Sequence, residues 1–172
     1  MHYISTRGQA PKVDFRGALL AGLASDGGLY VPEALPRFTA EQIAAMRGLS
    51  YQQLAYTLLR PFVGDSFTDD QLGLCIEKAY STSRHPDIAP LVELYPDHYL
   101  LELFHGPTLA FKDFALQLVG HLMDEALRDS PERAVVLGAT SGDTGSAAIA
   151  GCRGRKNLDI VILYPKGRTS DV

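Results

Sequence analysis

Hydrophobic and polar positions alternate differently in the two halves of the chain. Up to about residue 90, apolar residues recur at helical spacing, and three segments place a hydroxyl residue three positions ahead of a glutamine, which is the pattern of a capping box at a helix start. These segments begin at Thr39, Ser50 and Thr68. Another helix is expected over residues 15–23, and a short strand over 29–31 after a glycine-rich turn. The pattern predicts a mostly helical N-terminal domain over residues 1–90.

From residue 91 onward, short apolar runs alternate with helical patterns. The strands expected from these runs cover residues 91–94, 99–104, 134–137 and 160–163. Helical patterns over about 109–128 and 144–150 lie between the last three. This alternation is typical of a βαβαβ unit, in which helices pack on a parallel sheet. The sequence therefore predicts an α/β fold, with residues 91–172 forming an α/β region.

Three segments follow the last three expected strands. They read HGPTLAFKD (105–113), GATSGDTGS (138–146) and YPKGR (164–168). In a parallel sheet the carboxyl ends of the strands lie along one edge, where ligands bind. Lys112 and the glycine-rich loop are therefore expected to be neighbours.

Lys112 lies in an unusually apolar stretch, between Phe111 and the run 114–116. A lysine removed from water loses the stabilisation of its charged form, so its neutral amine becomes available as a Schiff-base nucleophile. The alternative is a lysine whose stem covers apolar surface while its ammonium reaches solvent or pairs with Asp113. The residues alone leave both interpretations open.

The segment GATSGDTGSAA, residues 138–148, has the composition of a strand-to-helix turn. Thr140 or Ser141 is expected to cap the following helix, and exposed backbone N–H groups at a helix start bind anions such as carboxylate or phosphate. A capped structural helix with a tight turn fits the same residues. The dinucleotide, P-loop and nucleophile-elbow patterns are all incomplete here.

Composition argues against several classes of protein. The chain of 172 residues is 46% hydrophobic and carries a net charge of −4 without a basic cluster, so a nucleic-acid partner is not expected. No apolar run approaches the ~20 residues that cross a bilayer, which favours a soluble cytoplasmic protein. Cys75 and Cys152 are expected to be reduced thiols. The five histidines show no metal-ligand spacing; His121 is interpreted as a packing residue, while His105 stays open.

At this point several long motifs show a resemblance to a known family. LFHGPTLAFKDF (103–114), GATSGDTGSAA (138–148), LYPKGR (163–168), YISTRG (3–8) and SDGGLYVPEALP (25–36) closely resemble the threonine synthases, which are pyridoxal 5′-phosphate enzymes of the tryptophan-synthase-β-like fold, also called fold type II. The resemblance extends over essentially the whole chain. It implies that the predicted α/β region is the start of that fold, incomplete at the C-terminus.

The resemblance also implies roles for individual residues. Lys112 would form a Schiff base with pyridoxal 5′-phosphate and then act as acid and base, and Phe111 would lie near the cofactor ring. Asp143 would lie near the 3′-oxygen of the cofactor, where related enzymes often have Asn. It would be protonated, act through a bridging group, or place its charge at the helix N-terminus. The substrate carboxylate would be bound by Thr140, Ser141, Gly142 and Thr144.

The reaction that the resemblance implies converts O-phospho-L-homoserine and water to L-threonine and phosphate, by γ-elimination and then β-addition. Members of the family are much longer, and their cofactor-phosphate loop belongs to segments beyond position 172. We therefore expect an N-terminal portion that is inactive alone. Two alternatives are another enzyme of the same fold, such as a dehydratase or a sulfhydrylase, and a non-catalytic anion-binding α/β module. Oligomeric state is not predicted.

Overall fold

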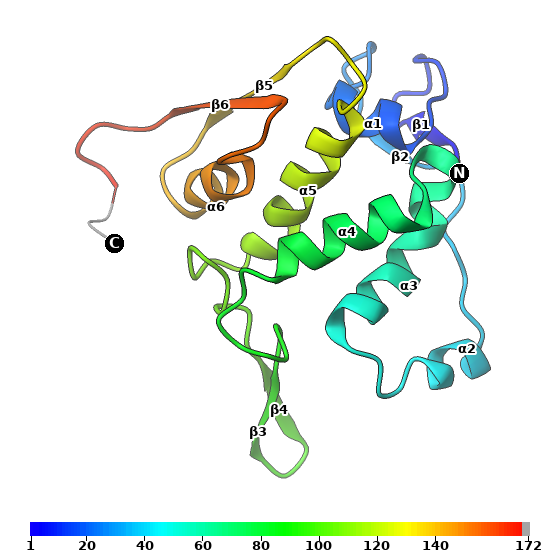
Figure 1. Ribbon diagram of the computed structural model, residues 1–172, viewed down its shortest axis with the longest axis vertical. Helices are drawn as coiled ribbons and strands as arrows, with labels where there is room; N and C mark the ends of the chain where they lie inside the picture. Colours follow the sequence, from blue (N-terminus) through cyan, green and yellow to red (C-terminus); the bar gives the residue numbers. More distant parts are fainter. Residues whose placement is uncertain (170–172) are drawn as a thin grey trace. The chain divides into compact units, whose positions relative to one another are not determined.

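The computed structural model describes residues 1–169 and divides the chain into two compact units, Met1–Leu74 and Cys75–Val172 (Figure 1). The division falls within helix α4 (Asp69–Tyr80). The domain boundary expected near residue 90 stays a prediction. Among residues 1–169, every helix is too short or too polar to span a membrane.

The first unit contains a small antiparallel strand pair and several helices. Strand β1 (Tyr3–Ser5) pairs with β2 (Tyr30–Pro32). The helices are α1 (Phe15–Ala21), α2 (Ala40–Ala45), α3 (Tyr51–Val63), the 3₁₀ turn η1 (Gly64–Ser66) and the start of α4. Val63, Phe67 and Leu72 are fully buried in this unit, and the ring of Phe67 packs edge-on against Phe15 at 5.9 Å.

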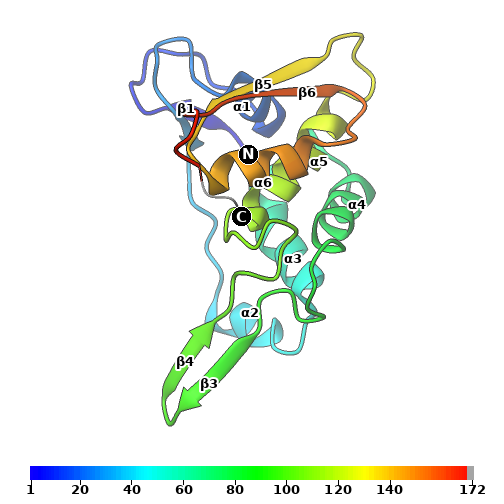
Figure 2. The same ribbon diagram turned by 90° about the vertical axis from the view of Figure 1, so that its left-hand side faces the viewer.

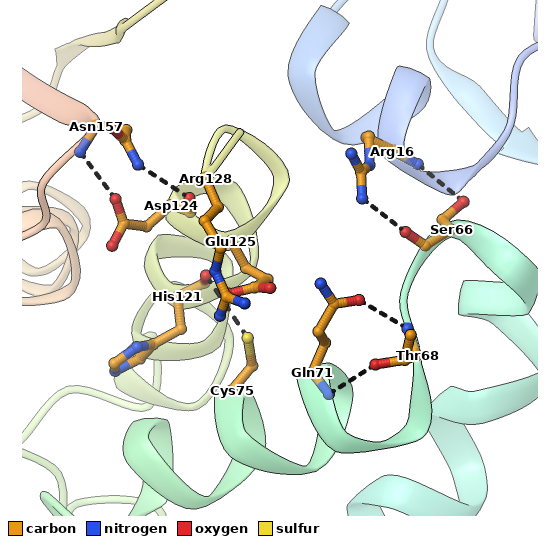
Figure 3. A network of polar contacts seen from close by, with 10 residues as sticks. All are labelled: Arg16, Ser66, Thr68, Gln71, Cys75, His121, Asp124, Glu125, Arg128 and Asn157. Carbon is orange, nitrogen blue, oxygen red and sulfur yellow. Dashed lines mark hydrogen bonds and ion pairs between the residues drawn. The ribbon is translucent and has the colours of Figure 1, made fainter. Parts of the chain in front are cut away.

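All three predicted capping boxes are confirmed. In α2 and α3 the hydroxyls of Thr39 and Ser50 accept from the backbone of the glutamine three residues on, and each glutamine side chain accepts in return. The third box precedes α4: Thr68 Oγ1 accepts from Gln71 N at 3.2 Å, and Gln71 Oε1 accepts from Thr68 N at 2.8 Å (Figure 3). Local side-chain chemistry therefore determines these helix starts.

The second unit contains the parallel strands. Strands β5 (Ala134–Ala139) and β6 (Leu158–Leu163) pair in parallel along their full length and are joined through α6 (Asp143–Cys152). Helix α5 (Asp113–Ala126) packs against α6 (Figure 2). The core beneath the strands is formed by Leu127, Cys152 and Leu158, with Met123, Ala134, Val136 and Ile160 packed around them. The predicted α/β class, with parallel strands and covering helices, is confirmed.

One strand assignment was wrong. Residues 99–104 were expected in the parallel sheet, but β4 (His98–Leu101) pairs antiparallel with β3 (Leu91–Tyr95) in a separate hairpin. Only Pro96 and Asp97 connect these strands, and Asp97 has a positive φ of 64°. A two-residue link can join antiparallel strands only, because a parallel pair needs a long crossover. The loop that carries Lys112 is consequently not the exit of a parallel strand.

Candidate functional site

Lys112 stands immediately before α5, as its N-cap residue, and is half-buried. Its Nζ lies 4.5 Å from the centroid of the Phe111 ring, a cation–π distance. Asp113, the expected alternative partner, directs its carboxylate to other groups. Within residues 1–169, no carboxylate forms an ion pair with Lys112. Among the described residues, the amine therefore lies against an aromatic face and forms no ion pair with a carboxylate.

Lys112 and Thr144 line the same pocket, which has a volume of about 390 Å³. The other lining residues are Phe111, Phe114, Ala115 and Leu116. The expectation that Lys112 neighbours the glycine-rich turn is thus met at Thr144. The expected cause was wrong, however, because the contact comes from packing of α5 on α6 and not from a shared strand edge.

Three other predicted residues face a different pocket. Thr140, Ser141 and Gly142 line a hollow of about 420 Å³ together with Ser146 and Tyr164. The rest of its lining comes from Gly145, Ile149, Ile160, Ile162 and Thr169. Asp143 lines neither pocket and is exposed in the first turn of α6. The glycine-rich turn therefore separates the two hollows, with Thr144 alone on the Lys112 side.

The start of α6 differs from the expected cap. Its N-cap residue is Gly142, with extended backbone, and no side chain caps the helix. Thr140 Oγ1 instead accepts a hydrogen bond from Gly142 N at 3.3 Å, inside the turn. The first backbone N–H groups of α6 are thus left for an external acceptor, and they carry the positive end of the helix dipole. Such a helix start can bind an anion.

A buried carboxylate organises the loop before Lys112. Asp113 is 2% exposed. Its Oδ2 accepts from Thr108 N at 2.9 Å, and its Oδ1 accepts from Thr108 Oγ1 at 2.9 Å and from Gln117 Nε2 at 3.2 Å. A Cβ on Gly106 would lie 2.4 Å from Oδ2, so only glycine admits this approach. Sequence reasoning had considered Asp113 only as a partner for Lys112.

Helices α5 and α6 touch through their backbones. A Cβ on Gly120 would lie 2.2 Å from the carbonyl oxygen of Gly151, and a Cβ on Gly151 would lie 2.3 Å from that of Leu116. Gln117 Nε2 also donates to Ala147 O at 3.3 Å across the same contact. These contacts determine how far the start of α5 lies from the start of α6.

The C-terminal half of α5 is held by polar contacts among residues that line neither pocket (Figure 3). Asn157 N donates to Asp124 Oδ1 at 2.8 Å, and Cys75 Sγ donates to His121 O at 3.6 Å. Burial raises the pKa of Cys75 to about 11 and, with the charges of Arg155 and Lys78, lowers that of His121 to about 4. Both cysteines are free and buried, as expected. His121 is a buried packing residue, as predicted.

His105 also lines neither of the two pockets. Its Nε2 lies 2.7 Å from Glu102 Oε2, and its ring packs at a tilt against Phe104 at 4.7 Å and against His85 at 4.9 Å. These partners are those of a packed side chain. The structure therefore favours the packing interpretation of His105.

Comparison with known proteins gives consistent matches. A family model described as the threonine synthase N terminus matches residues 2–80. The threonine synthase of Pseudomonas aeruginosa is 58% identical over 172 residues, which is 100% of this chain and 37% of that protein. The crystal structure of pyridoxal-phosphate-bound threonine synthase from Brucella melitensis has a TM-score of 0.95 and 54% identity, covering 99% of this chain and 37% of that one.

The yeast threonine synthase structure is also similar, with a TM-score of 0.90 and 41% identity over 98% of this chain and 36% of that one. The chain thus spans little more than a third of the length of the relatives it matches. The similarity includes both units and both motifs of the site. Over its whole length the chain matches the N-terminal portion of the threonine synthases.

Proposed function

We propose that this chain supplies the cofactor-holding lysine of a threonine synthase, and that the full-length protein converts O-phospho-L-homoserine and water to L-threonine and phosphate. The observation that carries the proposal is Lys112, whose amine pairs with no carboxylate of residues 1–169 and lines an apolar pocket beside Thr144. The family match and the bound cofactor of the Brucella relative support it.

The residues present fit pyridoxal 5′-phosphate. The pocket has an aromatic wall at Phe111 for a flat ring and a lysine for the aldehyde, and its volume of about 390 Å³ suits a molecule of that size. When bound, the cofactor supplies an electron sink for carbanions next to the substrate nitrogen. Lys112 would hold it covalently and then move protons at the substrate carbons. Phe114 and Leu116 would exclude water.

The uncapped start of α6 would bind the α-carboxylate of the substrate. Thr144 lies on the cofactor side, while Thr140, Ser141 and Gly142 face the neighbouring hollow. The carboxylate would therefore bind at the turn between the two pockets, on backbone N–H groups and threonine hydroxyls. This placement divides the predicted substrate residues between the two sides of one helix start.

Asp143 would lie near the 3′-oxygen of the cofactor, as the family resemblance implies. Its position in the first turn of α6 favours a negative charge, because the helix dipole is positive there. We propose that this charge is stabilised by the helix and that contact with the cofactor oxygen is made through a bridging group.

A further part of the proposal is that residues 1–90 form a domain separate from 91–172, and that the protein acts in the cytoplasm.

The decisive experiment is reduction of the full-length protein with borohydride in the presence of pyridoxal 5′-phosphate, followed by peptide mass spectrometry. The cofactor is expected on the peptide that contains Lys112, and it should be absent from Lys112→Ala and retained in the matched control Lys166→Ala. Cofactor on another lysine, or on none, would refute the proposal. A non-catalytic anion-binding module would give no covalent adduct.

Substrate comparison separates the proposed activity from its relatives. The full-length protein is expected to release phosphate from O-phospho-L-homoserine with formation of threonine. Turnover of O-acetylserine or of threonine in preference to the phosphorylated substrate would instead identify a sulfhydrylase or a dehydratase. The 172-residue chain tested alone is expected to show no turnover, because the cofactor-phosphate loop of the family lies outside it.

A further inference from the structure

The segment that carries Lys112 has no regular secondary structure. Residues 106–112 form a series of turns between the hairpin and α5. Leu109 within it has φ of 64°, in the left-handed region that a branched side chain rarely adopts. Such a conformation persists only where surrounding contacts over-determine it. Contacts elsewhere in the structure must therefore hold this segment in place.

The hydrogen bonds of Asp113 provide that restraint. The carboxylate reaches back five residues and accepts both the backbone N–H and the hydroxyl of Thr108, at 2.9 Å each. These two bonds join the ends of the segment 108–113, so that Leu109, Phe111 and Lys112 lie in a closed loop. Because Asp113 is almost completely buried, water cannot replace either bond at low cost.

Gln117 connects the closed loop to the second helix. Its amide donates to Asp113 Oδ1 at 3.2 Å and to Ala147 O of α6 at 3.3 Å. Ala147 is fully buried, one turn after Thr144, which lines the pocket of Lys112. A continuous path of hydrogen bonds therefore runs from the loop of Lys112 to the helix that presents Thr144.

We propose that Thr108, Asp113 and Gln117 form a clamp that positions the Lys112 amine relative to the start of α6. The inference rests on the proposed function and deepens it by naming positioning residues that touch neither substrate nor cofactor. The clamp fixes the strained turn at Leu109 before the cofactor arrives, so binding does not have to order the loop. This pre-organisation raises affinity by lowering the conformational cost of binding.

The test uses the full-length protein with Thr108→Val, which keeps the shape of the side chain and removes the hydroxyl. Thr108→Ser restores the hydroxyl and serves as the rescue variant. Thr57→Val is the matched control, because it removes a threonine hydroxyl that donates to Gln53 O within helix α3. Gln117→Met removes the bridge to α6 while keeping side-chain length.

Three readouts are required. In the cofactor-free protein, hydrogen exchange of the backbone amides in 108–113 is expected to accelerate ~10-fold in Thr108→Val, as loss of one buried hydrogen bond to a charged group predicts. Pyridoxal phosphate affinity, measured by titration, should fall ~10-fold, and the visible circular dichroism per bound cofactor should decrease, since the ring is held less rigidly. Thr108→Ser should restore all three values.

The outcomes distinguish the clamp from the proposed function. Unchanged exchange and affinity in both Thr108→Val and Gln117→Met, with the cofactor still captured on Lys112, would refute the clamp and leave the function intact. Faster exchange without any cofactor capture in the parent protein would refute the function and leave only a structural loop restraint. Loss of affinity in Thr57→Val as large as in Thr108→Val would show a general loss of stability and would also refute the clamp.

Discussion

Asp26 in the first unit and Asp113 in the second each hold a loop through hydrogen bonds to the carboxylate, but Asp26 is half-buried and Asp113 is buried. Asp26 Oδ1 accepts from the Ser5 hydroxyl at 2.7 Å and from Gly28 N at 2.9 Å, and Oδ2 accepts from Gln9 N and Ala10 N at 2.9 and 3.0 Å. Asp113 is buried and bonds two residues.

The two loops differ in what they hold in place. Asp26 ties the turn at 26–28 to residues 5–10, whereas the loop ordered by Asp113 places a lysine at a pocket. Four donors from four residues fix the first loop redundantly, so loss of one leaves three. The second loop depends on a few buried bonds. A site built on few, buried contacts is precise, and it is also sensitive to single changes.

The largest effect is expected from removing the two carboxylates. Asp113→Ala should lower the free energy of unfolding by about 3 kcal/mol, because it removes the acceptor of Thr108 N and Oγ1 and one of the two acceptors of Gln117 Nε2. Asp26→Ala should cost less, since Asp26 is only half-buried and Gln9, one of its donors, is exposed to water that can replace the lost acceptor. Urea denaturation of both variants measures the difference. Equal losses would mean that burial does not distinguish the two loops.

The matched glycines come next. A Cβ on Gly106 would meet Asp113 Oδ2 at 2.4 Å, and one on Gly28 would meet Ser5 Oγ at 2.2 Å. Each alanine variant should cost about 1–3 kcal/mol through overpacking. Hydrogen exchange should show the disturbance in 106–113 for Gly106→Ala and in 5–10 for Gly28→Ala. Cofactor affinity is expected to fall only in Gly106→Ala.

Acid first destabilises the second unit through His121. The folded pKa of about 4 lies below the ordinary value of 6.5, because burial and the charges of Arg155 and Lys78 disfavour the protonated ring. The unfolded chain therefore binds a proton that the folded chain does not, and stability declines as pH falls from 6.5 to 4. The slope of stability against pH in this window should be shallower in His121→Gln. A parent protein without a slope between pH 6.5 and 4 would contradict this.

Asp26 gives the smallest effect, at lower pH. The Ser5 hydroxyl and the N–H groups of Gly28, Gln9 and Ala10 lower its pKa from 3.8 to about 2. Because the folded pKa is depressed, its stabilisation is complete above about pH 4 and is lost as pH falls through 2. NMR titration of the Asp26 carboxyl should give a midpoint near 2, and Ser5→Ala should raise it. A midpoint near 3.8 would show that the loop is not held by this charge.

Sequence patterns predicted the features that depend on neighbouring residues. The capping boxes at Thr39, Ser50 and Thr68 follow from side chains that bond within their own turn. The strands predicted over 134–137 and 160–163, from apolar runs around a helix, lie within the parallel strands observed over 134–139 and 158–163. The hairpin was misassigned because periodicity was weighed without the two-residue link at Pro96 and Asp97, which was itself a readable signal.

The site was predicted in part. Lys112 and Thr144 were expected as neighbours and share a pocket, while Thr140 and Ser141 face the adjacent one. The two bonds between Thr108 and Asp113 and the bond from Gln117 to Ala147 were missed, because the first two span five residues and the third reaches into another helix. Hydrogen bonds that depend on tertiary approach have no spacing rule in the sequence. A threonine ahead of an aspartate at a helix start is the local hint that was available.

The close crossing of α5 and α6 has a consequence for how the protein can be varied. Gly120 and Gly151 face the carbonyl oxygens of Gly151 and Leu116 at distances that no side chain can occupy. A library randomised at these two positions and sorted for folded protein should return glycine at both, whereas Ile149, exposed on the same helix, should accept many residues. If this helix pair were grafted into another protein, the two glycines would have to be kept. The exposed face of α6 could be redesigned.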